Sequence, residues 1–381
     1  MDFSSFCASG ATGGGIRFAN RGSMIMKRWL AILGGLVLAW NGYGADVIAP
    51  KVLVIATYEV GKDRGDVPGE LQGWVEHENL DQAIKVPGIE HPLLTNGTGL
   101  YAMVSGTTSR SAIAMMTLAA DPRFDLRQTY FLLDGIAGAD PANMSIGSAA
   151  WIQYAVDGDP GYEIDNRETP ATWPYGIIAL GATQPGQPPP HLDSTPAAGV
   201  SENSAGGVGR VAWQINPTLV AWAYGLTKDV AIADSPALQA WRAKFPEPNA
   251  QKAPGVIEGA SLGTDKFWHG PIMNKWGEDW VNMYTRNAAP MVMSDCEDQG
   301  ICLALAQLDR LHKIDFKRFL ILRTASNYTV PGQGLTPDKS LFDNLANTPG
   351  YLPALDAGYQ VGSVVTKELV KNWAKYRDTV P

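Results

Sequence analysis

The chain has 381 residues, of which 45% are hydrophobic and 18% charged, and its 38 acidic residues outnumber its 30 basic ones for a net charge of −8. This composition excludes a disordered or fibrous protein and allows a large buried core. The acidic balance argues against nucleic acid or an anionic membrane surface as a partner. We therefore expect a soluble globular protein.

Residues 24–45 have the three-part pattern of a secretory signal peptide. The basic pair Lys27 and Arg28 precedes an apolar stretch over 29–40, and small residues up to Ala45 offer a cleavage site. The alternative is a buried helix, which the length also fits. Residues 1–23, rich in glycine and serine, are interpreted as an upstream extension. The pattern predicts a secreted or periplasmic protein.

The predicted core begins with two short apolar runs. Residues 51–57 are β-branched and fit a buried parallel strand, and residues 129–134 fit a second one. Between them we expect a glycine- and threonine-rich loop over 97–108. A helix is predicted over 109–120, because Asp121-Pro122 then ends the helical pattern.

The sequence changes in character after the next predicted strand. We expect a loop over 135–138 and a further strand of the same sheet over 148–156. From about 158 to 290, loops lengthen, prolines cluster at 185–190 and most of the tryptophans occur. We interpret this stretch as a large loop-rich insertion in a single domain over 46–381.

Regular structure is expected again near the carboxyl terminus, with a helix over 297–312, a strand over 319–323 and a helix from 360 to about 376. Strands that alternate with helices at both ends of the domain predict an α/β fold with a mainly parallel central sheet. Ligands of such sheets bind beyond the carboxyl ends of the strands, where loops converge.

The chain offers few metal ligands once residues 1–45 are removed. Cys296 and Cys302 remain, and cysteines six positions apart on one helix point to different faces. We interpret both as small core residues, with a disulfide as the alternative. No Cys/His cluster has metal-ligand spacing, so neither a metal ion nor another cofactor is expected.

Three segments resemble signatures of the nucleoside phosphorylase and nucleosidase superfamily. They are DGIAGADPANMSIGS at 134–148, MSDCEDQG at 293–300 and LRTASNY at 322–328. Together with WHG at 268–270, they make the chain resemble the purine nucleoside permease family in particular. This resemblance implies a nucleoside-phosphorylase-like three-layer fold and a purine nucleoside as ligand. The family name implies transport, whereas the fold is that of nucleoside phosphorylases.

The resemblance implies catalytic roles for three residues. Glu297 grips the ribose hydroxyls and stabilises the sugar as it becomes cation-like, Asn327 faces N7 of the purine, and Glu59 activates the attacking water. Asparagine can donate a hydrogen bond but no proton, and phosphorylases with asparagine here prefer 6-oxopurines, which favours inosine or guanosine. The ordinary alternatives are a helix-terminal charge for Glu297, a turn residue for Asn327 and a solvated charge for Glu59.

Candidate substrate contacts come from the same loops and motifs. Glycine lets backbone N–H groups approach a sugar or an anion closely, although each glycine also fits an ordinary turn. A flat aromatic face suits a purine, although tryptophan in such an insertion also fits simple core. The candidates are Tyr58, Gly106, Thr107, Arg110, Gly135, Ile136, Ala137, Gly138, Trp268, His269, Cys296 and Ser326.

The acceptor in the expected reaction is inferred from one departure from the superfamily pattern. Some phosphorylases hold phosphate with an arginine two residues before the glycine that matches Gly135, and this chain has Leu133 there. An apolar side chain cannot pair with a phosphate dianion, and Arg110 is the nearest substitute. Water is therefore favoured over phosphate.

These observations favour an exported purine nucleosidase that cuts the N-glycosidic bond, with Glu297 and Glu59 stabilising the cation-like sugar. A nucleoside phosphorylase is one alternative. Another is a non-catalytic component that captures nucleosides for uptake. That role requires a membrane transporter as partner, because the chain has no apolar span of about 20 residues of its own. Related folds commonly form dimers, trimers or hexamers, so a homo-oligomer also remains open.

Overall fold

A computed structural model describes residues 47–189 and 210–381 of the chain. The predicted extension over 1–23 and the predicted signal peptide over 24–45 lie outside these residues. Among the helices of the two described segments, none combines the length and the apolar character that crossing a membrane requires.

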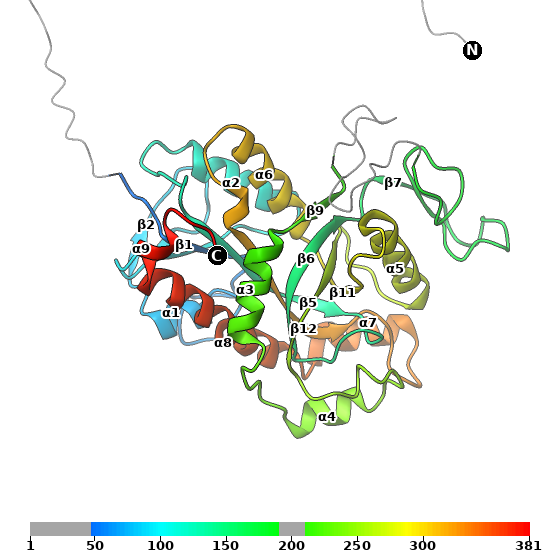
Figure 1. The fold of residues 1–381 in the computed structure, drawn as a ribbon. Coiled ribbons are helices and arrows are strands. Elements are labelled where there is room, and N and C mark those ends of the chain that lie inside the picture. The colour runs from blue at the N-terminus through cyan, green and yellow to red at the C-terminus, as the bar shows by residue number, and fades with distance from the viewer. Residues whose placement is uncertain (1–46, 190–209) are drawn as a thin grey trace, which may run out of the picture. The chain divides into compact units, whose positions relative to one another are not determined.

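The centre of the described segments is a ten-stranded sheet (Figure 1). Its strands are β1 (Val52–Ala56), β2 (Gln82–Ile84), β3 (Leu93–Thr95), β4 (Leu100–Val104), β5 (Tyr130–Ala139), β6 (Ala149–Asp157), β9 (Ala212–Gln214), β10 (Val256–Gly263), β11 (Met291–Asp295) and β12 (Phe319–Tyr328). The order is β11-β10-β6-β12-β5-β1-β4-β3-β2, and β9 pairs with β6. A separate antiparallel ribbon consists of β7 (Gly161–Glu163) and β8 (Ile177–Ala179).

The longest strand pairings in this sheet are parallel. β5 pairs in parallel with β1 and β12, β1 with β4, and β10 with β6 and β11. Antiparallel pairing joins β2 to β3, β3 to β4, β6 to β9 and β6 to β12. β11, the first strand in this order, also forms a short antiparallel pairing with the central strand β5. The prediction of an α/β fold with a mainly parallel sheet is confirmed.

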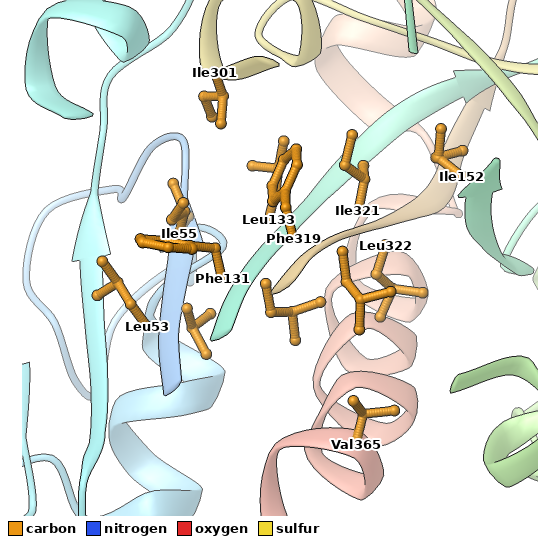
Figure 2. Packing of buried hydrophobic residues seen from close by; sticks show 14 of the residues in the cluster. Leu53, Ile55, Phe131, Leu133, Ile152, Ile301, Phe319, Ile321, Leu322 and Val365 are labelled. Atoms are coloured by element: carbon orange, nitrogen blue, oxygen red, sulfur yellow. The ribbon is translucent and has the colours of Figure 1, made fainter. Parts of the chain in front are cut away.

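Helices lie on both faces of the sheet, which makes three layers. They are α1 (Gln72–Glu78), α2 (Ser109–Ala120), α3 (Pro217–Thr227), α4 (Pro236–Arg242), α5 (Pro271–Thr285), α6 (Asp298–Arg310), α7 (Pro337–Asn347), α8 (Tyr351–Lys371) and α9 (Trp373–Tyr376). α1 and α8 lie on one side of the strands and α2 and α6 on the other (Figure 1). Figure 2 shows Ile301 of α6 and Val365 of α8 on opposite sides of β1, β5 and β12.

Cover on both faces explains why the central strands are apolar without alternation. All five side chains of β1 are buried, as are those of β5 from Tyr130 to Leu133. Leu133 is fully buried among these side chains, beside Phe319 and Ile321 of the neighbouring strand (Figure 2). Its side chain is therefore part of the hydrophobic core.

The prediction of a loop over 135–138 is wrong, because these residues continue β5 to Ala139. Their backbone pairs in parallel with β12, and Gly138 and Ala139 also pair with β11. Glycine and alanine have little intrinsic preference for strands, so the tertiary pairing outweighs their local tendency here.

Other predicted boundaries are also corrected. The expected loop over 97–108 contains β4, β12 extends beyond 323 to Tyr328, and the last long helix begins at Tyr351 rather than 360. The range 158–290 is not wholly an addition to the core, because it contains the sheet strand β10. Parallel pairing of β10 with β6 and β11 cannot be read from the local sequence.

Candidate active site

The carboxyl ends of β1, β5, β10, β11 and β12 converge on a cavity of about 280 Å³, which we call the central cavity. The structure brings most of the predicted site residues to its wall. They are Tyr58, Thr107, Ile136, Ala137, Gly138, Trp268, Cys296, Glu297, Ser326 and Asn327.

Glu297 presents a buried carboxylate to the central cavity. It lies directly before α6, where β11 has just ended, and only 6% of its surface is exposed. Its Oε2 accepts a hydrogen bond from Nη2 of Arg323 at 3.0 Å, whereas Oε1 has no partner among the described residues. Burial raises the pKa of Glu297 to about 7, against the opposing charge of Arg323. This geometry leaves one carboxylate oxygen for a ligand hydroxyl.

Arg323 is the cation that holds Glu297 in place. Its guanidinium is fully buried and also bonds Asp298 Oδ1, through Nε at 3.0 Å and Nη2 at 2.7 Å. Burial alone would lower the pKa of Arg323, but the charges of Asp298 and Asp295 raise it well above its usual value. Asp298 in turn accepts a hydrogen bond from the hydroxyl of Ser261. The arginine is thus charged, and its charge is shared among buried carboxyls.

Asp295 shapes the turn that carries Glu297. Its Oδ1 accepts hydrogen bonds from the backbone N–H groups of Glu297 and Asp298, at 3.0 and 2.9 Å, and so closes the turn that leads into α6. Burial, and then the charge of Asp298, raise the pKa of Asp295 well above its usual value. The carboxyl therefore fixes the backbone directly after Cys296, and Asp295 lines the central cavity.

A second buried carboxylate, Glu70, faces the central cavity from the segment before α1. Its Oε2 accepts hydrogen bonds from the backbone N–H and the hydroxyl of Thr57, both at 2.7 Å, and its Oε1 accepts one from the N–H of Ile136 at 2.8 Å. Burial raises the pKa of Glu70, while the Arg323 charge and these hydrogen bonds oppose the rise. The carboxylate is thereby fixed between β1 and β5.

Glu59, the predicted water-activating residue, does not line the central cavity. Its carboxylate accepts hydrogen bonds from the backbone N–H groups of Val60, Gly69, Leu71 and Gln72 at 2.5 to 2.9 Å. These bonds occupy both oxygens and direct the side chain towards the amino end of α1. In the structure, Glu70 rather than Glu59 presents its carboxylate to the site.

A β-bulge in β12 directs Ser326 and Asn327 to the site. The register with β5 shifts between Ala325 and Asn327, so that an extra residue bends the strand where it reaches the cavity. The Ser326 hydroxyl donates to Asn327 Oδ1 at 2.9 Å, and Asn327 Nδ2 donates to the carbonyl of Tyr328 at 3.2 Å. Because a carbonyl oxygen can only accept, the bond to Tyr328 fixes which end of the amide is the donor, and the second N–H of Nδ2 remains for a ligand acceptor.

Gly135 and Gly138 make room for side chains rather than for a bound anion. A Cβ on Gly135 would lie 2.4 Å from Arg323 Nη1 and 2.8 Å from Glu70 Oε1, so Gly135 permits both to approach the strand. A Cβ on Gly138 would lie 3.2 Å from Asn327 Nδ2. Gly135 itself does not line the central cavity.

Residues after β10 form the aromatic wall of the central cavity. Trp268 lines it as predicted, and so do its neighbours Phe267 and Lys266. Phe267 is 80% exposed, which is unusual for a ring beside a cavity. His269 does not line the cavity, and burial lowers its pKa to about 4. An exposed aromatic ring at this mouth is suited to cover a flat ligand.

The remaining predicted contacts line a second cavity of about 560 Å³, which shares Thr57, Tyr58 and Thr107 with the first. Gly106, Arg110 and Glu59 belong to its wall. Arg110, the predicted substitute for a phosphate-binding arginine, therefore lies beside the central cavity and not in it.

Cys296 and Cys302 are both buried and carry free thiols. The interpretation of the pair as core residues is confirmed, with the addition that Cys296 lines the central cavity. Burial, followed by the charge of Glu297, raises the pKa of the Cys296 thiol above its usual value, so the group stays protonated and unreactive.

Sequence reasoning missed Glu70, Arg323 and Asp295. Arg323 and Asp295 lie inside the motifs at 322–328 and 293–300, but nothing local shows that their side chains are buried and paired. Glu70 lies in no motif, and ten residues separate it from Glu59. Its only local signal is the turn-forming pair Pro68-Gly69 directly before it.

The raised pKa values predict that the protein loses stability as the pH rises. Burial raises the pKa of Glu297, Asp134 and Asp157 to about 7 each, far above the usual range of carboxyls. Between pH 4.5 and 7 the folded state therefore holds protons that the unfolded chain releases, so the free energy of unfolding falls as the pH rises, by about 1.4 kcal/mol per unit of raised pKa. His269 has the opposite effect on the free energy of unfolding, because its lowered pKa favours folding at higher pH. It is one group against these three carboxyls.

Urea unfolding at pH 5 and pH 8 measures this effect. We expect a lower free energy of unfolding at pH 8, and a smaller difference between the two values in Asp157→Asn, which removes one titrating carboxyl. Equal or greater stability at pH 8 would contradict the raised pKa values of these groups in the fold.

A family model and two relatives agree with the motifs. The model of the purine nucleoside permease family matches residues 49–381. A probable purine nucleoside permease of Schizosaccharomyces pombe is 25% identical over 273 residues, covering 70% of this chain and 74% of that protein. A purine nucleoside permease of Candida albicans is 24% identical over 349 residues, covering 88% and 79%. Among solved structures, the 5′-methylthioadenosine/S-adenosylhomocysteine nucleosidase of Neisseria meningitidis is 12% identical with a TM-score of 0.48, covering 85% of this chain and 100% of that one.

Proposed function

The chain belongs to the purine nucleoside permease family, and we propose that it binds a purine nucleoside in the central cavity and hydrolyses the N-glycosidic bond. One observation carries this proposal. Two buried carboxylates, Glu70 and Glu297, face a single cavity that also holds an amide donor, Asn327. Paired carboxylates suit a reaction in which a sugar becomes positively charged while water attacks it.

The polar groups of the central cavity support one arrangement of the nucleoside in the proposed complex. The purine lies against Trp268 and Phe267, with N7 accepting the free N–H of Asn327 Nδ2. The ribose hydroxyls donate to Oε1 of Glu297, the oxygen that Arg323 leaves free. An acceptor at N7 fits every purine, so the preference for inosine or guanosine rests on the asparagine having no proton to give.

In the proposed reaction the bond between C1′ and the base nitrogen breaks, and its electron pair leaves with the base. The sugar becomes oxocarbenium-like, and the carboxylates of Glu297 and Glu70 stabilise its charge. Glu70 takes a proton from the attacking water, whose oxygen bonds to C1′. A carboxylate whose pKa is raised by burial is a stronger base than one in water, which suits this role. Asn327 stabilises the departing base, which then gains its proton from solvent.

Water is proposed as the acceptor because, among the described residues that line the central cavity, no cation is free to hold phosphate, and Arg110 lines the second cavity instead. Leu133 is fully buried in the core, and Arg323 is bonded to Glu297 and Asp298. Lys266 lines the central cavity, but its Nζ bonds Glu163 at 2.6 Å on the surface. A phosphate dianion would meet Glu70 and Glu297 instead of a positive partner.

Product analysis tests this proposal. The purified chain is incubated with inosine, with and without phosphate, and the sugar product is identified by chromatography. We expect free ribose under both conditions. Ribose 1-phosphate formed only in the presence of phosphate would replace hydrolysis with phosphorolysis.

The names of the relatives favour a second candidate function, capture of nucleosides for transport. The same central cavity would then bind the nucleoside without reaction, and a membrane protein would carry it onward. Isothermal calorimetry separates the two functions. Saturable binding of inosine that leaves the nucleoside intact after hours supports capture, whereas heat from continuous turnover supports hydrolysis.

Base preference gives a further prediction. Asn327→Asp places a group that can carry a proton opposite N7, which favours departure of adenine, a poorer leaving group than hypoxanthine. We expect the ratio of kcat/KM for adenosine to that for inosine to rise by about tenfold, within the usual range for a positioned general acid. The ratio is measured from initial rates of base release. An unchanged ratio would mean that Asn327 does not face the base.

A further inference from the structure

Glu59 and Tyr58 bind four successive backbone N–H groups around Glu70. Glu59 Oε1 accepts from Gly69 at 2.5 Å, and Glu59 Oε2 accepts from Leu71 at 2.9 Å and from Gln72 at 2.6 Å. The N–H of Glu70 itself donates to the carbonyl of Tyr58 at 3.2 Å. The backbone on both sides of Glu70 is therefore held by the two residues that directly follow Thr57.

Close packing at Gly69 shows how tightly this segment is held. A Cβ on Gly69 would lie 2.7 Å from Glu59 Cα, 2.9 Å from its Oε1 and 3.0 Å from the carbonyl of Tyr58. Only glycine fits there without displacing the loop. A second anchor lies nearby, because the Tyr351 hydroxyl donates to the carbonyl of Pro68 at 2.8 Å and accepts from the Tyr58 hydroxyl at 3.1 Å.

The carboxylate of Glu59 binds the backbone N–H groups of Gly69, Leu71 and Gln72 rather than a ligand. A carboxylate that accepts several backbone N–H groups is strongly oriented, and charge-assisted bonds of this kind are about twice as strong as neutral ones. Both oxygens are occupied, and although Glu59 belongs to the wall of the second cavity, it does not line the central cavity. Glu70, by contrast, has its carboxylate at the cavity and takes its orientation from Thr57, Ile136 and this clamped backbone.

We propose that Glu59 is a positioning residue, which clamps the backbone of residues 69–72 so that the Glu70 carboxylate is fixed at the central cavity. The inference rests on the proposed function in one respect, since it takes Glu70 as the base that activates water. Misplacement of a reacting group by about 1 Å can cost on the order of a hundredfold in rate. Glu59 therefore acts on the reaction through Glu70 alone.

A double-mutant cycle tests this dependence. Glu59→Gln replaces one accepting oxygen by a donor that cannot bind an N–H group, and we expect kcat for inosine to fall by about 10- to 100-fold with little change in KM. In a chain that already carries Glu70→Gln, the same substitution should have no further effect on kcat. Glu76→Gln is the matched control, because Glu76 also bonds a loop N–H group and Gln72 but none of the four N–H groups around Glu70. Its kcat should equal that of the wild type.

Two kinetic outcomes would overturn the proposal. If Glu59→Gln leaves kcat unchanged, the clamp is not needed for the reaction. If the losses of Glu59→Gln and Glu70→Gln multiply in the double variant, Glu59 acts independently of Glu70, as it would if it contacted substrate or simply destabilised the fold.

Amide hydrogen exchange tests the clamp even if the chain proves to have no hydrolytic activity. In Glu59→Gln, peptides that contain Gly69–Gln72 should exchange about tenfold faster than in the wild type, with no such change in Glu76→Gln. Unchanged exchange in this segment would contradict the clamp itself. An inactive wild-type chain with faster exchange in Glu59→Gln would instead contradict only the proposed hydrolysis.

Discussion

Replacing Glu297 by glutamine should lower kcat for base release from inosine by about a thousandfold, in the range expected when a group that stabilises a transition-state charge is lost. Glutamine keeps the size of the side chain but removes the negative charge opposite the oxocarbenium-like sugar. It also presents an N–H group where Oε1 would accept a ribose hydroxyl. The effect on KM should be smaller, because the charge on the sugar develops only in the transition state.

Initial rates measured by chromatography of the free base check this prediction. Glu168→Gln, an exposed glutamate outside both cavities, serves as the matched control and should retain wild-type rates. The fold should survive Glu297→Gln, because Arg323 keeps its two bonds to Asp298. A Glu297→Gln chain with a normal kcat would exclude Glu297 from the reaction.

Arg323→Met should lower the free energy of unfolding by about 3–5 kcal/mol at pH 8, the usual cost of removing one partner from a buried ion pair. Methionine fills much of the space but leaves the carboxylates of Asp298 and Glu297 buried without their cation. Glu297, whose pKa is raised by burial, can regain part of the loss by binding a proton. The destabilisation should therefore be smaller at pH 5 than at pH 8.

Urea unfolding of the variant and the wild type at both pH values measures the loss. Arg127→Met is the control, because Arg127 pairs with Asp125 on the surface with 70% of its side chain exposed, and such pairs contribute at most about 1 kcal/mol. Equal effects of the two substitutions would contradict the role of Arg323 as the cation that neutralises the buried carboxyls.

Strands and helices of the fold were predictable where a short stretch of sequence carries a clear hydrophobic pattern. Residues 51–57 and 148–156 are apolar because helices cover both faces of the sheet, and they form β1 and β6 as predicted. The helix over 109–120 was predictable from the Asp121-Pro122 pair that ends it. The continuation of β5 through 135–138 was not, because a glycine- and alanine-rich stretch becomes a strand only through its pairing with β11 and β12.

Residues of the candidate site were predictable where they lie in a motif that resembles the family. Glu297, Asn327 and Ser326 line the central cavity because their motifs end strands whose carboxyl ends converge there. The partner of Glu297 was not predictable, because an arginine within a strand gives no sign that it is fully buried. Glu70 was missed for a different reason. The loop over 59–69 separates it from β1, and only the folded chain brings its carboxylate back to Thr57.

The same loop explains why Glu59 was a plausible prediction for the water-activating residue, although Glu70 is the carboxylate at the central cavity. It follows β1 closely, as expected for a group at the site, yet its carboxylate points to the backbone around Glu70. A sequence shows which acidic residues lie near a strand end. It does not show which of them accepts hydrogen bonds from the backbone and which faces the cavity.

The most direct measurement is release of hypoxanthine from inosine in phosphate-free buffer by the full chain and by Glu70→Gln. We predict steady release by the wild type, equimolar with free ribose, and a rate at least about a hundredfold lower for Glu70→Gln, as for the loss of a general base. No release by the wild type under these conditions would contradict hydrolysis. Equal release by both chains would contradict the assignment of Glu70 as the base.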